Sequence, residues 1–283
     1  MQILFGPQKK YCNILPINFL KKEIITKYLS KYSNKFNIIL FNTLNSTNQY
    51  LIDNYSICKF DNLPVNVVST EFQFNGCGRY NRKWYSSLCG GLTFSFPWCF
   101  SRNISTISSL GLVIGIAIIR VLRRFVDKEI HIKWPNDIVY GRSKLAGILI
   151  ELRSKINGPS VAIIGIGINF YLPSSISSYF DQDVTDLSNI SEKRLDRNEI
   201  FGYLLVELYK VLRDFEKYNF TFFKEEWISY HAYQGKSVKL TLPNNESAIG
   251  VVDGINDDGS IRLITATSCY SYHSGNITMR LNN

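Results

Sequence analysis

Between residues 38 and 218, short runs of β-branched and aromatic residues alternate with longer segments whose apolar residues recur at helical spacing. Such strands favour a buried sheet, and a helix with one apolar face needs a sheet or another helix to cover it. The alternation therefore predicts an α+β fold in which helices back a mixed β-sheet. The predicted strands are 38–41, 65–70, 92–96, 130–134, 145–152 and 160–168, and the predicted helices are 108–125 and 198–218.

The pattern changes after Gly235. Short alternating runs joined by PNNE, NDDG and HSG turns predict a small antiparallel barrel of about 50 residues. We therefore predict an N-terminal extension (1–37), a main domain (38–234) and a C-terminal barrel (235–283). The predicted barrel strands are 237–242, 249–252, 260–264 and 276–281.

Two segments outside this pattern complete the prediction. Residues 17–29 have the apolar spacing of one short amphipathic helix, and the polar, broken segment 173–191 is predicted to be a loop. The longest apolar run, 110–119, is far shorter than the ~20 residues needed to cross a bilayer. The N-terminus lacks the charged-then-apolar order of a signal peptide, so we expect a cytoplasmic protein without a membrane partner.

Cysteine and charge content narrow the function only partly. The six cysteines show no paired short spacing, which argues against a disulfide framework or a zinc site and favours reduced thiols. The formal net charge of +9 suits anionic partners such as nucleotides, nucleic acid or an acidic protein. A surface that is simply rich in lysine explains the same charge, and no basic run marks a nucleic-acid face.

Three segments combine residues that suit chemistry. The first, 73–84, contains two glycines that allow close backbone approach to a ligand, together with Arg79, Arg82 and Lys83, which can bridge a carboxylate and a phosphate. A glycine- and arginine-rich surface turn would have the same composition.

The second segment is KWPND at 133–137, followed by KLAGILIE at 144–151. A strand delivers Lys133, Pro135 turns the chain, and a hairpin would expose Asn136 and Asp137, whose oxygens suit Mg²⁺. An ordinary turn explains the Asn-Asp pair equally well. Lys144 stands at the start of an apolar strand, which suits an electrostatic catalyst.

The third segment is GIGIN at 165–169, where two glycines again permit close approach and Asn169 supplies a polar contact. A dinucleotide-binding fingerprint needs a third glycine that opens a helix, and none is present. The segment therefore does not indicate a Rossmann fold.

Taken together, the segments resemble the biotin protein ligase family. NSTNQY at 45–50, the glycine/arginine loop ending at Trp84, and the KWPND, KLAGILIE and GIGIN motifs follow one another in the family's order. The resemblance implies a class II synthetase-like catalytic domain with a C-terminal SH3-like barrel. It also implies that biotin reacts with ATP to give biotinyl-5′-AMP and pyrophosphate, and that a carrier lysine then takes the biotin and releases AMP.

The resemblance assigns roles to individual positions. Lys144 matches the catalytic lysine, and Arg79 matches the second arginine of the loop, which helps to retain the adenylate. Trp84 either packs beneath the loop or lies near adenine. The positions expected to contact biotin are Ser46, Thr47, Asn48, Gln73, Gly76, Cys77, Gly78, Arg79, Lys144 and Gly147. The positions expected to contact ATP are Arg79, Arg82, Trp84, Lys133, Asn136, Asp137 and Asn169, and Asp137 is expected to bind Mg²⁺.

The loop departs from the family pattern at two positions. Cys77 stands where the family has its first arginine, and loss of a charged hydrogen bond typically costs ~1.5–3 kcal/mol. Lys83 is a candidate for compensating this loss. Asn81 replaces a glycine, which is tolerable because Asn adopts left-handed backbone angles more readily than most residues.

The resemblance also implies partners. The default carrier is the biotin carboxyl carrier protein of acetyl-CoA carboxylase, and edge strands of the sheet offer a place for two copies to form a homodimer. Some family members carry a winged helix-turn-helix, for which about 40 residues before the NSTNQY motif leave too little room, so we expect no specific DNA binding.

Two alternatives remain at this point. A lipoate or octanoate transferase of the same superfamily also uses a lysine, although KWPND and the C-terminal barrel argue against it. A biotin-responsive regulator or binding protein without turnover is compatible with the positive charge and with Cys77.

Overall fold

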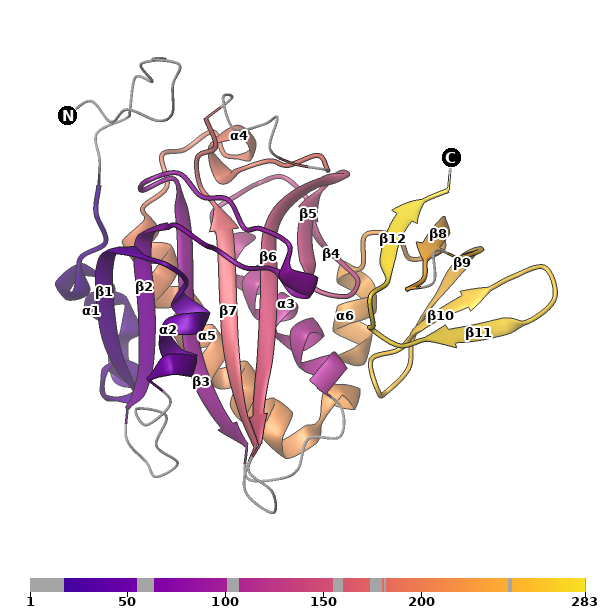
Figure 1. The fold of residues 1–283 in the computed structure, drawn as a ribbon, viewed down its shortest axis with the longest axis horizontal. Coiled ribbons are helices and arrows are strands. Elements are labelled where there is room, and N and C mark those ends of the chain that lie inside the picture. Colours follow the sequence, from indigo (N-terminus) through magenta and orange to yellow (C-terminus); the bar gives the residue numbers. More distant parts are fainter. Residues whose placement is uncertain are drawn as a thin grey trace.

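The computed structural model describes residues 18–54, 64–100, 107–154, 160–173, 180, 182–243 and 246–282. The strands of its main sheet are β1 (Phe36–Leu44), β2 (Val65–Gln73), β3 (Gly91–Phe100), β4 (Ile130–Lys133), β5 (Asp137–Tyr140), β6 (Ser143–Ser154) and β7 (Ser160–Asn169). They are ordered β1-β2-β3-β7-β6-β5-β4; β1 and β2 are parallel and the other neighbours are antiparallel (Figure 1). The predicted mixed sheet is confirmed.

A second sheet follows at the C-terminus. Its strands are β8 (Ser237–Thr241), β9 (Ser247–Ile255), β10 (Ile261–Ile264), β11 (Cys269–Tyr272) and β12 (Thr278–Leu281). They pair antiparallel in the order β11-β10-β9-β8-β12. The predicted separate antiparallel unit is confirmed. The strand β11 was not predicted, because its four residues are too few to show a clear alternation of apolar and polar side chains.

Six α-helices are described, and the longer ones back the main sheet. They are α1 (Lys22–Leu29), α2 (Thr47–Asp53), α3 (Ile107–Leu122), α4 (Leu187–Ile190), α5 (Arg197–Tyr218) and α6 (Lys224–Tyr230). In Figure 1, α3 and α5 lie behind the sheet and α2 lies in front of it. Buried apolar side chains of α3 and α5 form one core with those of the sheet. The face that carries α2 is therefore free to bear a site.

The sequence did not predict three short helices, α2, α4 and α6. Four to seven residues are too few for a 3.6-residue period to stand out. Ser46 caps α2 by accepting a hydrogen bond from the Gln49 amide (3.4 Å). The segment 173–191, predicted to be a loop, contains α4, which Asp186 caps through the Asn189 amide (3.0 Å).

The predicted N-terminal helix is present over Lys22–Leu29. Its Ile25 and Leu29 are fully buried, and it packs against α5 so closely that a Cβ at Gly202 would lie 2.5 Å from Tyr28 Cβ. This segment therefore shares the core of the main sheet. Residues 1–17 of the predicted extension lie outside the described residues.

Trp134 and Arg120 join the units of the structure. Trp134 is buried and its indole N–H donates to the Gly259 carbonyl of the C-terminal unit (3.1 Å). Arg120, in the last turn of α3, where the helix dipole favours cations, donates to Glu207 on α5 (2.9 Å) and to Glu226 on α6 (2.6 Å). These bonds fix the helices and the C-terminal sheet against each other.

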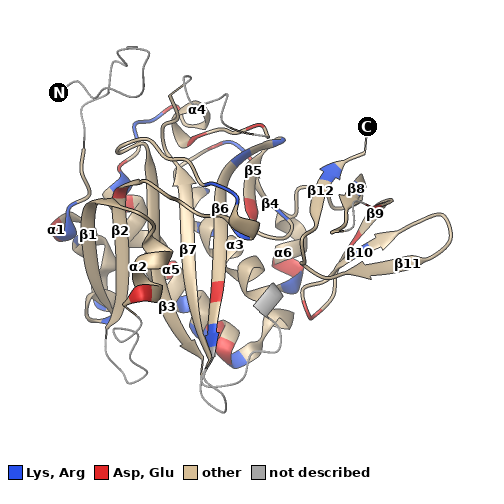
Figure 2. Ribbon diagram, in the orientation of Figure 1, with Lys and Arg blue, Asp and Glu red and all other residues tan. Residues whose placement is uncertain are grey.

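No described helix is long and apolar enough to cross a bilayer. Figure 2 shows Lys and Arg distributed over both sheets and the helices, interspersed with Asp and Glu. The four described cysteines, Cys77, Cys89, Cys99 and Cys269, carry free thiols, and Cys12 and Cys58 lie outside the described residues. Burial raises the pKa of the Cys89 thiol to about 12, as expected for a protonated structural thiol.

A buried ion pair ties the N-terminal segment to the sheet. Arg197, at the start of α5, donates to the Glu71 carboxylate in β2 (2.7 Å) and to the Gly91 carbonyl (2.8 Å). The other Glu71 oxygen accepts the Leu20 amide. Both side chains are more than 90% buried. A charge held this way is strongly destabilising when its partner is removed.

We therefore expect Arg197→Met to lower the free energy of unfolding by about 3–5 kcal/mol, because the Glu71 carboxylate would stay buried without its cation. Urea denaturation measures this. Arg213→Met is the matched control, since the Arg213 side chain is 63% exposed in its ion pair with Glu216 and the loss of this pair should cost less than about 1 kcal/mol. Similar losses in the two variants would contradict the structural role of Glu71.

Candidate functional site

Three glycines form the floor of a pocket on the α2 face of the main sheet. Gly147 in β6 pairs with Gly167 in β7, and Gly165 lies two residues before Gly167 on the same face. A Cβ at Gly167 would lie 2.5 Å from the Trp84 ring, and a Cβ at Gly165 would lie 2.3 Å from Asn48 Oδ1. The glycines of KLAGILIE and GIGIN therefore make room for two side chains that line the pocket.

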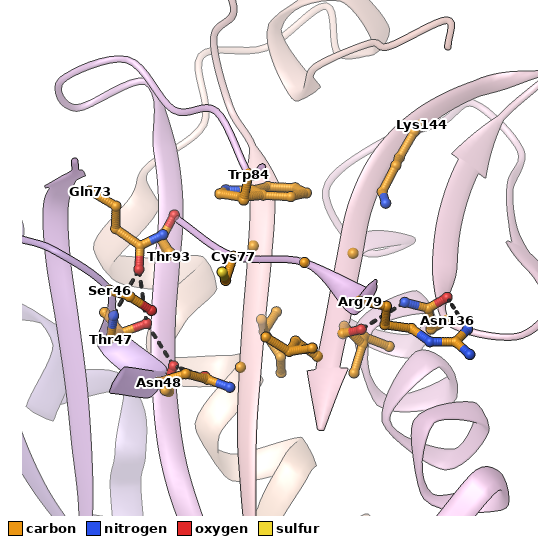
Figure 3. Close-up of a pocket in the computed structure, with 18 residues that line it drawn as sticks. Ser46, Thr47, Asn48, Gln73, Cys77, Arg79, Trp84, Thr93, Asn136 and Lys144 are labelled. Atoms are coloured by element: carbon orange, nitrogen blue, oxygen red, sulfur yellow. Dashed lines mark hydrogen bonds between the residues drawn. The ribbon is translucent and has the colours of Figure 1, made fainter. Parts of the chain in front are cut away.

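Polar side chains close one side of this pocket. The Thr47 amide donates to Gln73 Oε1 (2.8 Å), and Thr47 Oγ1 lies 2.6 Å from Ser95 Oγ. Ser95 Oγ donates to Asn48 Oδ1 (2.5 Å). Figure 3 shows Ser46, Thr47, Asn48 and Gln73 gathered on this side, with Arg79, Asn136 and Lys144 on the other and the Trp84 ring between them. The arrangement suits a small ligand with its own donors and acceptors.

The segment between Gly76 and Trp84 folds as a tight loop over the pocket. The Trp84 amide donates to the Gly76 carbonyl (2.8 Å), and the Gly78 amide donates to the Arg82 carbonyl (2.7 Å). Asn81 has a φ of 57°, which is the left-handed conformation expected when Asn replaces the family's glycine. A Cβ at Gly76 would lie 2.4 Å from the Trp84 carbonyl oxygen. Gly76 therefore closes the loop and does not itself line the pocket.

The loop presents Arg79 to the far side of the pocket. Its guanidinium donates to Asn136 Oδ1 (3.1 Å) and to the Gly275 carbonyl (2.7 Å) of the C-terminal unit. Asn136 is oriented by its own bond to the Ile148 carbonyl (2.8 Å). The turn that carries Asn136 follows a cis Trp134–Pro135 peptide bond between β4 and β5, so the predicted hairpin is present.

Lys144 lies where the loop, the hairpin and β6 meet. Its Nζ is 2.7 Å from Asp137 Oδ1 and 5.7 Å from the centre of the Trp84 ring. The side chains of both ion-pair partners are largely buried, with 19% and 16% exposed. The ammonium therefore has a fixed position and a neutralising partner before any ligand binds.

A second, larger pocket adjoins the first and is strongly basic. It is lined by Arg79, Arg82, Lys83, Lys133, Lys144 and Arg280, while Asp137 is its one carboxylate among the described residues. Burial lowers the pKa of the Lys133 ammonium; Asp137 opposes this, and the neighbouring Lys144, Arg280 and Arg82 lower it further. Such crowding of cations favours a multiply charged anion.

The structure gathers most of the predicted residues around these two pockets. Of the positions expected to contact biotin, all except Gly76 line the first pocket. Of those expected to contact ATP, all except Asn169 line the second. Asn169 is buried, and its amide donates to the carbonyls of Thr185 (3.0 Å) and Lys144 (3.5 Å), so it supports the strand that carries Lys144.

Several lining residues were missed. Thr93 and Ser95 of β3 face the first pocket, and Ile277, Met279 and Arg280 bring the C-terminal unit to the second. A serine or threonine within a strand carries no motif, and residues from a separate domain reach the pocket only through tertiary packing. Alternation along β3 was the available signal, since Thr93 and Ser95 lie two apart.

The residues near Asp137 form no metal cage of their own. No group of three or more His, Cys, Asp or Glu side chains that could hold a metal ion occurs in the described parts of the chain. A divalent ion at this place would need ligand oxygens from a bound phosphate, which is the usual arrangement for Mg²⁺.

Comparison with known proteins gives this geometry a context. Residues 40–169 match the profile of the Biotin/lipoate A/B protein ligase family. The bifunctional ligase/repressor BirA of Escherichia coli is 30% identical over 274 residues, covering 97% of this chain and 82% of BirA. The chain belongs to the biotin protein ligase family.

Two further relatives agree with this membership. The biotin–[acetyl-CoA-carboxylase] ligase of Mycobacterium tuberculosis is 26% identical, covering 70% of this chain and 72% of the relative. The structure of the Aquifex aeolicus biotin protein ligase with biotin and ATP superimposes with a TM-score of 0.72 at 26% identity, covering 87% of this chain and 99% of that one. The predicted family, fold and enzyme class are thus confirmed.

The glycine floor makes a direct prediction. A methyl group at Gly167 would collide with the Trp84 ring, so Gly167→Ala should weaken biotin binding about tenfold or more and cost about 1–3 kcal/mol of stability. Calorimetric titration with biotin and urea denaturation measure the two effects.

Gly111→Ala provides the control, because a Cβ there meets only ordinary contacts at 3.7 Å in α3. Alanine is the better helix former, so this variant should be neutral or slightly stabilising. Equal biotin affinity in Gly167→Ala and the wild type would contradict the packing of Trp84 on the floor.

Proposed function

We propose that this ligase joins the biotin carboxylate to the α-phosphate of ATP across the junction of the two pockets, and then passes biotin to a lysine of a carrier protein. One observation carries the proposal. The polar pocket and the basic pocket share five lining residues, which are Gly78, Arg79, Trp84, Asn136 and Lys144. A reaction between two anionic substrates needs its cations at such a shared boundary.

The polar pocket suits the head group of biotin. The ureido ring carries two N–H donors and one carbonyl acceptor, which the hydroxyl and amide groups of Ser46, Thr47 and Gln73 can complement. Trp84 and Leu149 supply apolar surface. In this orientation the valeryl carboxylate extends toward Lys144.

In the first step a carboxylate oxygen of biotin attacks the α-phosphorus of ATP. The bond from that phosphorus to the bridging oxygen breaks, and pyrophosphate leaves with the electron pair. Lys144 and Arg79 neutralise the two approaching anions and the charge that grows on the phosphoryl oxygens. The basic pocket, with Lys133 and Arg82, holds the remaining phosphates.

In the second step the neutral amine of a carrier lysine attacks the biotinyl carbonyl carbon. The bond to the AMP oxygen breaks, AMP leaves as an anion, and the amine loses a proton to give the amide. Arg79, held between Asn136 and the Gly275 carbonyl, retains the adenylate until the carrier arrives.

Mg²⁺ belongs to the proposal as a companion of ATP. Asp137 offers one oxygen beside the basic pocket, and one or two carboxylates together with substrate phosphates commonly hold this ion. When bound, the metal would neutralise phosphate charge. Asp137 would then serve both the metal and Lys144.

The partners of the reaction are also proposals. The name of the Mycobacterium tuberculosis relative supports the carrier of acetyl-CoA carboxylase as the acceptor. Among the described strands, β1 pairs with a neighbour on one side only, and this free edge supports pairing of two copies. A cytoplasmic location and catalysis without specific DNA binding complete the proposal, and a gel-shift assay with biotin operator DNA tests the latter.

The decisive experiment is incubation of the chain with ATP, Mg²⁺, biotin and a carrier domain, followed by intact-mass measurement. We expect the carrier to gain one biotinyl group. Lys144→Ala should slow adenylate formation by about 10²–10³-fold while the fold is retained, because an electrostatic stabiliser of the transition state is lost.

Lys210→Ala is the matched control, since it removes a lysine from the exposed surface of α5. Adenylate formation at an unchanged rate in Lys144→Ala would refute the role of Lys144. Pyrophosphate exchange that depends on lipoate and not on biotin would refute the substrate, and biotin binding without labelling would indicate a binding protein.

The loop offers a gain-of-function test at Cys77, which lines the first pocket where the family pattern has arginine. Cys77→Arg should slow the release of biotinyl-5′-AMP about ten- to hundred-fold, because a charged hydrogen bond contributes ~1.5–3 kcal/mol. Stopped-flow chase with excess biotin measures the release rate.

Cys269→Arg adds the same charge at an exposed thiol on β11, so it controls for net charge. Unchanged or faster adenylate release in Cys77→Arg would show that the loop has no need of the missing arginine.

A further inference from the structure

Glu151, the last residue of KLAGILIE, does not line either pocket. It lies in β6, two and four residues beyond the lining positions Leu149 and Gly147 and on their face of the sheet. Its carboxylate accepts a hydrogen bond from Asn48 Nδ2 (2.8 Å). The contact reaches from β6 to α2, between residues 103 positions apart.

This contact fixes which way the Asn48 amide points. An ionised carboxylate only accepts hydrogen bonds, so the NH₂ group of Asn48 must face Glu151. The amide oxygen must then face Ser95, whose hydroxyl lies 2.5 Å away. Because an amide oxygen only accepts, Ser95 is the donor in that bond.

The same reasoning fixes which group donates in the hydrogen bond between Ser95 and Thr47. A serine hydroxyl has one proton, and Ser95 gives it to Asn48. The 2.6 Å contact between the hydroxyls of Thr47 and Ser95 therefore has Thr47 as its donor, in preference to the longer contact of Thr47 Oγ1 with Gln73 Oε1 (3.2 Å). Gln73 Oε1 in turn accepts the Thr47 amide at 2.8 Å, so its NH₂ group stays available as a donor.

We propose that Glu151 is a positioning residue that sets the donor and acceptor pattern of the biotin pocket. Its carboxylate leaves the lone pairs of Thr47 Oγ1 available to accept a ureido N–H, while Gln73 keeps its donor for a ligand acceptor. The inference rests on the proposed function, since biotin supplies that ureido group.

If the hydrogen bonds that link Asn48, Ser95 and Thr47 ran in the opposite direction, the pocket would present the wrong donor and acceptor pattern to biotin. With Asn48 turned over, its NH₂ group would donate to Ser95, and Ser95 would donate to Thr47. The Thr47 proton would then point away from Ser95, toward Gln73 or the ligand. A ureido N–H facing that proton would lose its acceptor, and an unmet polar group in a buried site is costly.

Glu151→Gln tests this directly, because a carboxamide is almost the same size but accepts and donates, so it no longer dictates the direction. We expect the Kd for biotin to rise about tenfold, the loss of roughly one hydrogen bond. The KM for ATP should stay the same. The rate of adenylate formation at saturating biotin should change less than about twofold, because the groups at the reacting atoms are untouched.

A double-mutant cycle shows whether Glu151 acts by setting the direction of these hydrogen bonds or only by supporting the structure of the pocket. Ser95→Ala removes the hydroxyl that links Asn48 to Thr47 and should raise the Kd for biotin by a similar factor. In that background Glu151→Gln should have little further effect, because its influence passes through Ser95. Glu192→Gln, an equal change of charge at an exposed position, should leave the Kd unchanged.

An unchanged Kd in Glu151→Gln, or fully additive effects in the double variant, would overturn the inference while the wild type still forms biotinyl-5′-AMP. If the wild type forms none, the proposed function itself fails. Circular dichroism checks that each variant is folded. If Glu151→Gln is not, Ser95→Ala decides alone, and an unchanged Kd in that variant overturns the inference.

Discussion

The site depends on the absence of side chains at three positions of two neighbouring strands. Gly147, Gly165 and Gly167 leave space above the sheet, and Trp84 and Asn48 occupy the edges of that space. A sheet packed on both faces has no room for a ligand, because protein interiors are dense. The pocket is therefore built into the strands themselves. Its charged groups come from strands (Lys133, Asp137, Lys144 and Arg280) and from the loop before Trp84 (Arg79, Arg82 and Lys83).

The two sides of the site balance charge differently. On the polar side, neutral groups bond one another and the carboxylate of Glu151 is engaged by Asn48. On the basic side, Asp137 offsets Lys144 while Arg79 relies on carbonyl oxygens of Asn136 and Gly275.

The sequence predicted the main strands, the long helices and the separate C-terminal unit because apolar periodicity is strong in each. The ordered motifs identified most pocket residues through resemblance. Periodicity could not find α2, whose seven residues are held by a serine cap, nor the contribution of Met279 and Arg280, which depends on tertiary packing. Asn169 matched a motif, yet it supports the Lys144 strand from behind. A motif match does not distinguish a residue that contacts the ligand from one that supports such a residue.

The Glu71–Arg197 ion pair has a consequence for the order in which the chain matures. Its partners are separated by 126 residues, and the same carboxylate holds the Leu20 amide. During synthesis β2 leaves the ribosome well before α5. Until Arg197 is available, burial of Glu71 would leave its negative charge without a cationic partner, which is costly. The first strands of the sheet reach their final packing only after residue 197 has emerged. The N-terminal third of the chain thus depends on a late segment to finish folding.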